Sequence, residues 1–293
     1  MIVYHYDAFT HVPNQGNPAG VVFEADHLDE ATMLEIAGQV GFNETVFVQS
    51  SSVATVRLRY FTPGHEINLC GHATMAAIYG LRTRGYLNSV PEITIETKAG
   101  ILPVALTLDS SDLLTIRMQQ SEPQFVPFGG DQERLMHAIG LSLNDLDTRY
   151  PIVYGSTGTW TLLIPIRTLH AFASMLPEPS QFSVLLTEMP HASIHPFGFD
   201  TTHPEAMMHA RHFSSPYSGT IEDPVTGTAS GVMGAYYLTY IQSEMDQLSC
   251  LIEQGHEVQR DGRVQVDVKR TARGMNVYVS GNAVFVKELV IAP

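Results

Sequence analysis

One short sequence pattern occurs twice in this chain of 293 residues, once in each half. In both copies a glutamate stands four residues before a Cys or Thr, and a glycine follows directly. The offset between the copies is 156 residues (227 − 71, 222 − 66) for each of three pairs, Glu66 with Glu222, Cys70 with Thr226, and Gly71 with Gly227. Repeats that span about half a chain indicate duplicated domains, so the pattern predicts two similar lobes.

Each copy also predicts a buried helix. In the first copy, alternation over 57–61 is typical of a half-buried strand, Pro63-Gly64 marks a turn, and a helix is expected from His72 to about Arg84. Its apolar positions cover nearly the whole circumference, which is typical of a helix buried on all sides. The small and apolar residues after Gly227 predict a second such helix. We therefore expect an α+β fold of two pseudo-symmetric lobes, residues 1–125 and 126–293, each a strand-rich barrel around a central buried helix. Terminal strands that cross between the lobes are compatible with this division.

The starts of these two helices are candidate anion sites. The first N–H groups of a helix have no partner within it, and the helix dipole adds positive potential there. Gly71 would let a ligand approach the backbone closely. If both helix starts face one cleft between the lobes, they suit a ligand that carries a carboxylate. The alternative for each is an ordinary glycine turn that caps a core helix.

Composition and motifs limit the function classes. The formal net charge is −14, so no basic nucleic-acid footprint is present. No run of about 18 apolar residues predicts a membrane span, and the start of the chain lacks the basic region of a signal peptide. Two cysteines, Cys70 and Cys250, make no disulfide framework, so a reduced cytoplasmic location is expected. The chain lacks a hydrolase elbow, a Walker loop and a dinucleotide fingerprint, which argues against the common hydrolase, nucleotide-binding and NAD-dependent classes.

Glu44 is the candidate acid–base residue. It stands where a loop enters the apolar stretch Val46-Phe47-Val48. One interpretation is a surface or capping carboxylate, which is the commoner case for a single glutamate. The other is a partly buried carboxylate with a raised pKa, suited to moving protons.

Three local patterns lead to further expectations. His191 and His195 have the i, i+4 spacing of metal ligands, but Pro190 and Pro196 would break the helix that such a site needs. We therefore expect no metal, and solvated loop histidines between 191 and 212. The Pro- and Gly-rich segment 123–130 is the expected linker, and 184–186 is expected to be a strand.

Four separated blocks, in order, resemble the phenazine-biosynthesis PhzF-like family, which is related in fold to diaminopimelate epimerase. The blocks are Asp7-Ala-Phe-Thr with Gly16-Asn-Pro-Ala-Gly20, Asn43-Glu-Thr45, Phe61-Thr-Pro with Cys70-Gly-His-Ala-Thr74, and Glu222-Asp-Pro-Val-Thr-Gly-Thr228. The resemblance covers nearly the whole chain. It implies the two-lobed epimerase-like fold, a cofactor-free site in the cleft and often a homodimer.

The resemblance also implies roles for individual residues. The residue that matches Glu44 moves a proton within the substrate ring of the phenazine enzyme, and the matches to His72 and Asp223 hydrogen-bond the substrate or help the transfer. The matches to Gly71, Gly227 and Thr228 hold ligand groups, partly through backbone N–H. The substrate contacts predicted for this chain also include Asn17, Cys70 and Thr226.

This chain departs from both relatives at the paired cysteine positions. The epimerase uses one cysteine from each lobe as opposed bases, whereas this chain has Cys70 and Thr226 there. A threonine hydroxyl is too weak an acid to replace a thiolate, so epimerisation by two cysteines is not expected. The phenazine enzyme lacks the cysteine at position 70. Cys70 is either a second base opposite Glu44 or a small buried residue, the commoner fate of a free cysteine.

The leading hypothesis is a cofactor-independent isomerase that moves a proton on a small carboxylate-bearing metabolite. A second hypothesis is an epimerase or racemase that uses Glu44 and Cys70. A third is a non-enzymatic protein that binds a ligand or another protein on the same scaffold. No nucleic-acid or membrane partner is expected.

Overall fold

A computed structural model describes residues 1–87, 90–108, 110 and 112–291. Contacts within the chain group it into two compact units. Unit 1 comprises residues 1–119 together with 280–293, and unit 2 comprises residues 120–279. The expected boundary at residue 125 stays a prediction, because compactness alone does not say which segment folds by itself.

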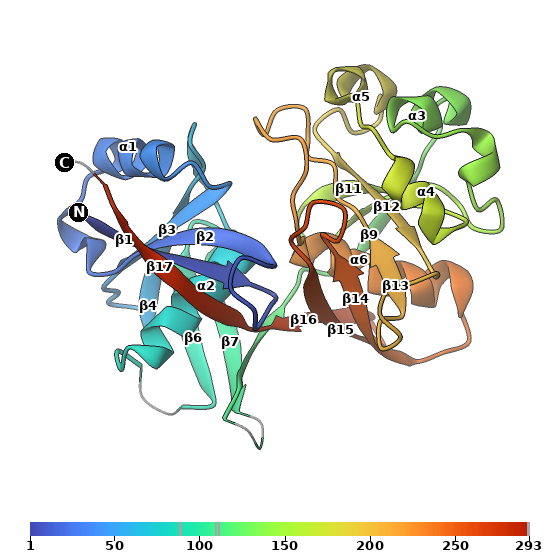
Figure 1. Cartoon of the computed structure of the whole chain (residues 1–293). Coiled ribbons are helices and arrows are strands. Elements are labelled where there is room, and N and C mark those ends of the chain that lie inside the picture. Colours follow the sequence, from blue (N-terminus) through green and yellow to red (C-terminus); the bar gives the residue numbers. More distant parts are fainter. Residues whose placement is uncertain (88–89, 109, 111, 292–293) are drawn as a thin grey trace. The chain divides into compact units, whose positions relative to one another are not determined.

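Unit 1 is built on a mixed sheet in the strand order β17-β1-β2-β3-β4-β6-β7-β8, with β5 also paired to β4. The pairs β2–β3 and β4–β6 are parallel and the others are antiparallel. The strands are β1 (Ile2–Ala8), β2 (Asn17–Val22), β3 (Glu44–Gln49), β4 (Val56–Phe61), β5 (Glu66–Ile67), β6 (Glu92–Thr97), β7 (Gly100–Leu108), β8 (Leu114–Gln119) and β17 (Ala283–Val290). Strands β1 and β17 lie side by side in Figure 1. The Met1 ammonium group donates to the Ile291 carbonyl at 2.8 Å.

Helix α2 (Gly71–Thr83) is the buried helix of unit 1, as its sequence predicts. It packs against β1, β2, β3, β8 and β17, so strands from both ends of the sheet contact the same helix. At Gly80 an added Cβ would lie 2.7 Å from the Phe23 ring, so only glycine allows this close approach. A short 3-10 helix, η1 (Ala25–His27), precedes α1 (Glu30–Val40). Helix α1 begins where the Asp29 carboxylate accepts from the Thr32 N–H, and it buries its apolar side against β3 and β4.

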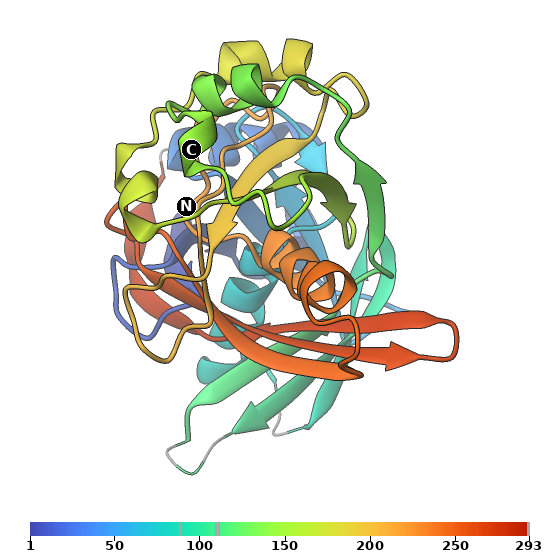
Figure 2. The same ribbon diagram turned by 90° about the vertical axis from the view of Figure 1, so that its right-hand side faces the viewer.

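Unit 2 has a second mixed sheet in the order β9-β10-β11-β12-β13-β14-β15. Its strands are β9 (Gln124–Pro127), β10 (Val153–Ser156), β11 (Trp160–Pro165), β12 (Ser193–Gly198), β13 (Met208–Ala210), β14 (Gln247–Gln254) and β15 (Gly262–Thr271), and β16 (Gly274–Gly281) ends at the junction with unit 1. Helix α6 (Gly227–Tyr236) continues into a π-helical turn, η3 (Tyr237–Ile241). It packs against β10, β14 and β15 (Figure 2). The sequence predicts this buried helix correctly.

The other helices of unit 2 close a separate apolar cluster. They are α3 (Gln132–Ala138), η2 (Leu143–Asp145), α4 (Leu169–Ser174) and α5 (Pro179–Leu185). Helices α3 and α5 lie side by side in both views (Figures 1 and 2). The strand expected at 184–186 is therefore wrong. Pro179 opens a helix, Phe182 and Leu185 turn to the core at helical spacing, and Val184 is 65% exposed.

The expected linker at 123–130 is also wrong. Four of its residues, Gln124–Pro127, form β9, where Val126 pairs with Tyr154 of β10, and Phe128 packs against the apolar cluster. The mixed α+β class is confirmed, whereas closed barrels and pseudo-symmetric lobes stay predictions. Within the described part of the chain, no helix is both long and apolar enough to cross a membrane.

Candidate active site

The candidate site of unit 1 begins at one edge of its sheet. Strands β2 and β3 run parallel with Ala19 opposite Glu44, so their first residues, Asn17 and Glu44, start from the same end. The first turn of α2 brings Cys70 and His72 to these residues. The sheet register and one helix start thus gather four of the residues that the sequence singles out.

Glu44 and His72 form the centre of this group. The Glu44 Oε2 atom lies 3.2 Å from His72 Nε2, and the two side chains are 17% and 8% exposed. This carboxylate oxygen is buried and accepts no hydrogen bond from any described residue, because the ion pair lacks hydrogen-bond geometry. A buried acceptor without a donor is costly in a folded protein, so such an atom is often explained by a functional role.

The opposite ring nitrogen of His72 has two neighbours. Asn17 Nδ2 lies 3.1 Å from His72 Nδ1, and the Cys70 Sγ atom lies 3.4 Å from the same nitrogen. A neutral Nδ1 would accept from the NH2 end of the Asn17 amide, whereas a protonated Nδ1 would donate to its carbonyl end. With both neighbours on one ring nitrogen, the orientation of the ring is fixed.

The surroundings of His72 and Cys70 raise the pKa of both side chains, with a different consequence for each. Burial opposes a charge on His72, yet Cys70 and Glu44, negative when deprotonated, outweigh burial and raise the pKa of His72 well above its usual value. Burial, and next the Glu44 carboxylate, raise the pKa of the Cys70 thiol. Near neutral pH we therefore expect Cys70 to be a thiol, so that the Glu44 carboxylate is the negative group that favours a charge on His72.

The first turn of α2 is open on the side where a ligand could approach. Cys70 takes the N-cap position, and its side chain makes no capping hydrogen bond. An added Cβ at Gly71 would meet nothing within 4 Å. Backbone N–H groups at an uncapped helix start can bind an anionic group.

The same cluster has the composition of a metal site. One ligand atom from each of Glu44, Cys70 and His72 lies within 4.8 Å of the other two. A carboxylate, a thiolate and an imidazole are ligands that zinc accepts. The expectation of no metal therefore needs a direct test.

The predicted residues of unit 2 form their own hydrogen-bonded group. Thr226 Oγ1 donates to Asp223 Oδ2 at 2.5 Å, and Gln254 Nε2 donates to the Asp223 carbonyl at 2.8 Å. The Thr226 N–H donates to Gln254 Oε1 at 3.1 Å. Gly227 and Thr228 begin α6, and the Thr228 carbonyl accepts from Thr157 Oγ1 at 3.0 Å. Asp223 is therefore held in place by its own neighbours.

Three histidines in unit 2 were predicted wrongly from the sequence, since His195, His209 and His212 are all buried. His195 lies on β12 and is fully buried, and its Nδ1 atom is 3.1 Å from Nδ1 of the buried His212. Burial lowers the pKa of His195 well below its usual value and that of His212 to about 4, so both are neutral near pH 7. They are not solvated loop histidines as expected, because strand pairing that no local pattern reveals brings them inside. His191, by contrast, is exposed.

The chain was compared with known proteins. The family model PhzC-PhzF, described as phenazine biosynthesis-like protein, matches residues 6–289. An uncharacterized isomerase, YfhB of Bacillus subtilis (strain 168), is 48% identical over 97% of this chain and 96% of its own length. A crystal structure of a PhzF-family phenazine biosynthesis protein from Bacillus anthracis is 51% identical, with a TM-score of 0.98 over 100% of this chain and 99% of that one.

More distant proteins extend the likeness. The trans-2,3-dihydro-3-hydroxyanthranilate isomerase of Pseudomonas fluorescens is 27% identical over 95% of this chain and 94% of its own length. A probable proline racemase from Agrobacterium radiobacter K84 shares the fold at 10% identity, with a TM-score of 0.59 over 99% of this chain and 92% of that one. The sequence-based recognition of a PhzF-like family is confirmed, as is the prediction of an isomerase-type enzyme.

Proposed function

Because the chain belongs to the family of phenazine biosynthesis-like proteins, whose relatives are named isomerases, we propose that it moves a proton on a small carboxylate-bearing metabolite without a cofactor. In this proposal Glu44 is the acid–base. The relative that acts on trans-2,3-dihydro-3-hydroxyanthranilate suggests one candidate substrate, a ring that carries a carboxylate.

One observation supports the role of Glu44 most strongly. Its Oε2 atom is buried, accepts no hydrogen bond from the described residues and lies 3.2 Å from His72 Nε2. A carboxylate that only holds a helix or a loop has its oxygens occupied by donors. An open acceptor beside an imidazolium can instead receive a proton from a substrate carbon.

The proposed step balances as a proton transfer alone. Glu44 takes a proton from a carbon next to a carboxylate or within a conjugated ring. The electron pair of the broken C–H bond remains in the conjugated anion, and Glu44 returns the proton to another carbon. The charged His72 and the N–H groups at the start of α2 stabilise the negative charge that develops.

We propose that Asp223 and Thr226 orient the substrate, with backbone groups at Gly227 and Thr228 as further contacts. Their supporting geometry is the hydrogen bond from Thr226 to Asp223 and the clamp by Gln254. That they act on the same substrate as Glu44 stays a prediction. A variant such as Asp223→Asn that changes KM or turnover for the substrate of Glu44 would support it.

A second candidate is an epimerase in which Glu44 and Cys70 serve as two bases. It is favoured by the 3.4 Å approach of Cys70 Sγ to His72 Nδ1, since an imidazole can take the thiol proton. The raised pKa of the buried thiol favours the isomerase instead. Cys70→Ser separates them, because it should abolish epimerisation but leave most of an isomerisation that needs only Glu44.

The decisive experiment uses exchange with deuterium oxide. Wild type and Glu44→Gln are incubated with a library of small carboxylates, including trans-2,3-dihydro-3-hydroxyanthranilate, and label is located by NMR. Wild type should introduce deuterium into at least one compound, and Glu44→Gln should lower the rate at least about 100-fold. The position of the label separates isomerisation from inversion at a stereocentre.

Glu35→Gln is the matched control, since Glu35 is an exposed glutamate on α1 of the same unit. It should exchange like wild type. Equal label uptake by wild type and Glu44→Gln would remove Glu44 from its role. Treatment with a chelator should leave exchange unchanged, whereas loss of exchange and its return with Zn²⁺ would make the Glu44, Cys70 and His72 cluster a metal site.

A homodimer and a cytoplasmic location complete the proposal. The homodimer follows from the family resemblance, and the cytoplasmic location from the two cysteines, which are buried and free. Sedimentation equilibrium would test the first, and cell fractionation the second.

A further inference from the structure

The side chains of Glu44, Cys70 and His72 offer three different ligand types to one metal ion. Zinc binds carboxylate oxygen, thiolate sulfur and imidazole nitrogen in a tetrahedral arrangement, in which two ligand atoms lie about 3.4–3.6 Å apart. His72 Nε2 lies 3.2 Å from Glu44 Oε2 and 3.8 Å from Cys70 Sγ, and the three atoms lie within 4.8 Å of one another. The protein therefore holds these atoms at nearly the separations of zinc ligands.

Regular structure holds the three ligands in place. Glu44 begins β3, Cys70 is the N-cap of α2, and His72 lies in the first turn of that helix. Asn17 lies 3.1 Å from the opposite ring nitrogen of His72, Nδ1. A polar neighbour on the far nitrogen is typical of a metal-bound histidine, because it orients the ring. With its carbonyl end toward Nδ1, the Asn17 amide accepts the N–H that remains when Nε2 binds a metal.

The Glu44 carboxylate provides a second, independent indication of a cation. Its Oε2 atom is buried and accepts no hydrogen bond from the described residues. A buried carboxylate oxygen in that state is stabilised by a positive charge in contact with it. Room for a fourth ligand, a water molecule, exists at the start of α2, since an added Cβ at Gly71 would meet nothing within 4 Å.

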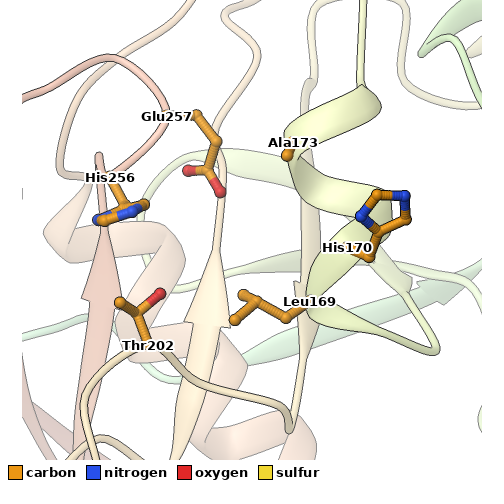
Figure 3. A pocket seen from close by; sticks show the side chains of 6 residues that line it. All are labelled: Leu169, His170, Ala173, Thr202, His256 and Glu257. Carbon is orange, nitrogen blue, oxygen red and sulfur yellow. The ribbon is translucent and has the colours of Figure 1, made fainter.

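Other histidine and glutamate groups of the described chain offer no such set of three ligand atoms. His209 lies between Glu253 and Glu257, but it contacts them through opposite ring nitrogens, at 2.7 and 2.9 Å. One metal ion cannot contact all three from there. In the unit 2 pocket that α4 lines, the His170 ring points away from Glu257 (Figure 3).

We propose that the Glu44, Cys70 and His72 side chains bind one Zn²⁺ ion, and that this ion inhibits the enzyme. On binding, the Cys70 thiol and a charged His72 each release one proton to the buffer, and zinc takes their places. The ion then occupies the carboxylate that receives the substrate proton. Inhibition rests on the proposed function of Glu44, whereas zinc binding does not.

The first test measures binding with cobalt(II) chloride as the probe. Co²⁺ takes the ligands that zinc takes and absorbs near-ultraviolet light when a thiolate binds it. Full-length protein, freed of metal by EDTA and dialysis, should gain this absorption with Co²⁺ and lose it when ZnCl₂ is added. Cys70→Ser should abolish the absorption and weaken zinc binding, measured by calorimetry, at least about 100-fold, because losing a ligand costs more than the roughly 10–100-fold of an outer partner.

Two further variants serve as checks on binding. Glu44→Gln removes another ligand and should weaken zinc binding about as much as Cys70→Ser. Cys250→Ser changes the other cysteine, on β14 of unit 2, and should bind both metals like wild type. Circular dichroism verifies that each variant is folded. No cobalt–thiolate absorption in wild type, or equal absorption in Cys70→Ser, would overturn the proposed site.

The second test measures inhibition on a compound that wild type labels in deuterium oxide. Saturating ZnCl₂ should lower the exchange rate at least about 100-fold, as expected when an acid–base group is blocked. EDTA should restore the rate. Undiminished or faster exchange with zinc bound would overturn the inhibition. The cobalt absorption does not depend on turnover, so failure of the proposed function and failure of the zinc site give different results.

Discussion

The two helix starts of this protein share a framework and differ in their chemistry. Before α2, the Arg59 guanidinium donates two hydrogen bonds to the Glu66 carboxylate, from Nε at 2.7 Å and from Nη2 at 2.8 Å. Before α6, the Arg211 guanidinium donates to the Glu222 carboxylate from the same two atoms, at 2.9 and 2.6 Å. In both units the same glutamate also forms a β-bridge with the phenylalanine two residues after the arginine. These bridges pair Phe61 with Glu66 and Phe213 with Glu222.

The likeness extends into the helices. The Thr74 hydroxyl donates to the Cys70 carbonyl at 2.7 Å, and the Ser230 hydroxyl donates to the Thr226 carbonyl at 2.9 Å. These two hydroxyls stand at the same offset as the repeated glycines. Such matched contacts are what an internal duplication would leave, although the duplication itself stays a prediction.

The differences lie on the groups that can carry a proton. Unit 1 has Cys70 and His72 beside its glycine, and unit 2 has Thr226 and Thr228 at the matching places. Neither threonine titrates near neutral pH. One framework can therefore present acid–base groups in one unit and neutral hydrogen-bonding groups in the other.

The largest expected difference is in turnover. His72→Gln removes the charge 3.2 Å from Glu44, and should lower the rate of label exchange about 100-fold or more. Thr228→Val, at the matching place, removes at most one neutral hydrogen bond and should cost about tenfold or less. Exchange rates in deuterium oxide measure both. Equal losses would show that the two helix starts contribute alike.

The next difference is in stability. Glu222→Gln leaves Arg211, whose side chain is 8% exposed, with carbonyl partners from Phe172 and Met175. We expect a loss of about 3 kcal/mol in the free energy of unfolding, because a buried charge loses its carboxylate. Glu66→Gln should cost less, about 1–2 kcal/mol, because Arg59 keeps Glu30 at 2.9 Å.

Urea denaturation of both variants measures this difference. The single tryptophan, Trp160, lies on β11 and reports on unit 2 by fluorescence, while circular dichroism reports on the whole chain. A larger loss for Glu66→Gln than for Glu222→Gln would show that Glu30 does not support Arg59.

The third difference is in the response to acid. Tyr60 follows Arg59, and burial raises the pKa of Tyr60. His212 follows Arg211, and burial lowers the pKa of His212 to about 4. A histidine with a lowered pKa binds protons more weakly in the folded state, so stability falls as pH falls below about 6.5, the ordinary value, toward the folded pKa. The contribution of His212 is about 3 kcal/mol by pH 4, and His195 adds to it.

Unfolding free energies between pH 7 and pH 5 check this prediction. His212→Tyr, which places in unit 2 the residue found in unit 1, should lessen the slope whatever it does to stability at pH 7. His191→Gln, at an exposed position, should leave the slope unchanged. A slope equal to that of wild type in His212→Tyr would mean that the acid response arises elsewhere.

Local sequence pattern was enough to predict the strand and helix around Cys70, but not the buried histidines of unit 2. The strand over 57–61, α2, and the neighbouring positions of Cys70, Gly71 and His72 follow from periodicity and turn residues within a short stretch. The family blocks add Glu44 and Asn17, which the parallel pair β2–β3 brings beside that helix start.

The contacts that the sequence missed join distant segments. His195 and His212 are 17 residues apart, and His209 lies 44 and 48 residues from its two glutamates. Their burial depends on the pairing of β12 with β13 and of β13 with β14, which no local spacing determines. The wrong strand at 184–186 has the same origin, because a three-residue apolar run has no period of its own.

The smallest expected difference concerns the two hydroxyls inside the helices. Ser230→Ala removes one hydrogen bond to the Thr226 carbonyl and should cost about 1 kcal/mol. Thr74→Val should cost more, about 2 kcal/mol, because the Thr74 hydroxyl also lies 2.7 Å from the fully buried hydroxyl of Tyr60, which would lose its partner. Urea denaturation measures both. Tyr60→Phe combined with Thr74→Val should recover part of the loss, since no buried hydroxyl then lacks a partner. If it recovers nothing, the two helix starts are equally supported at this position and the cost of Thr74→Val comes from the Cys70 carbonyl alone.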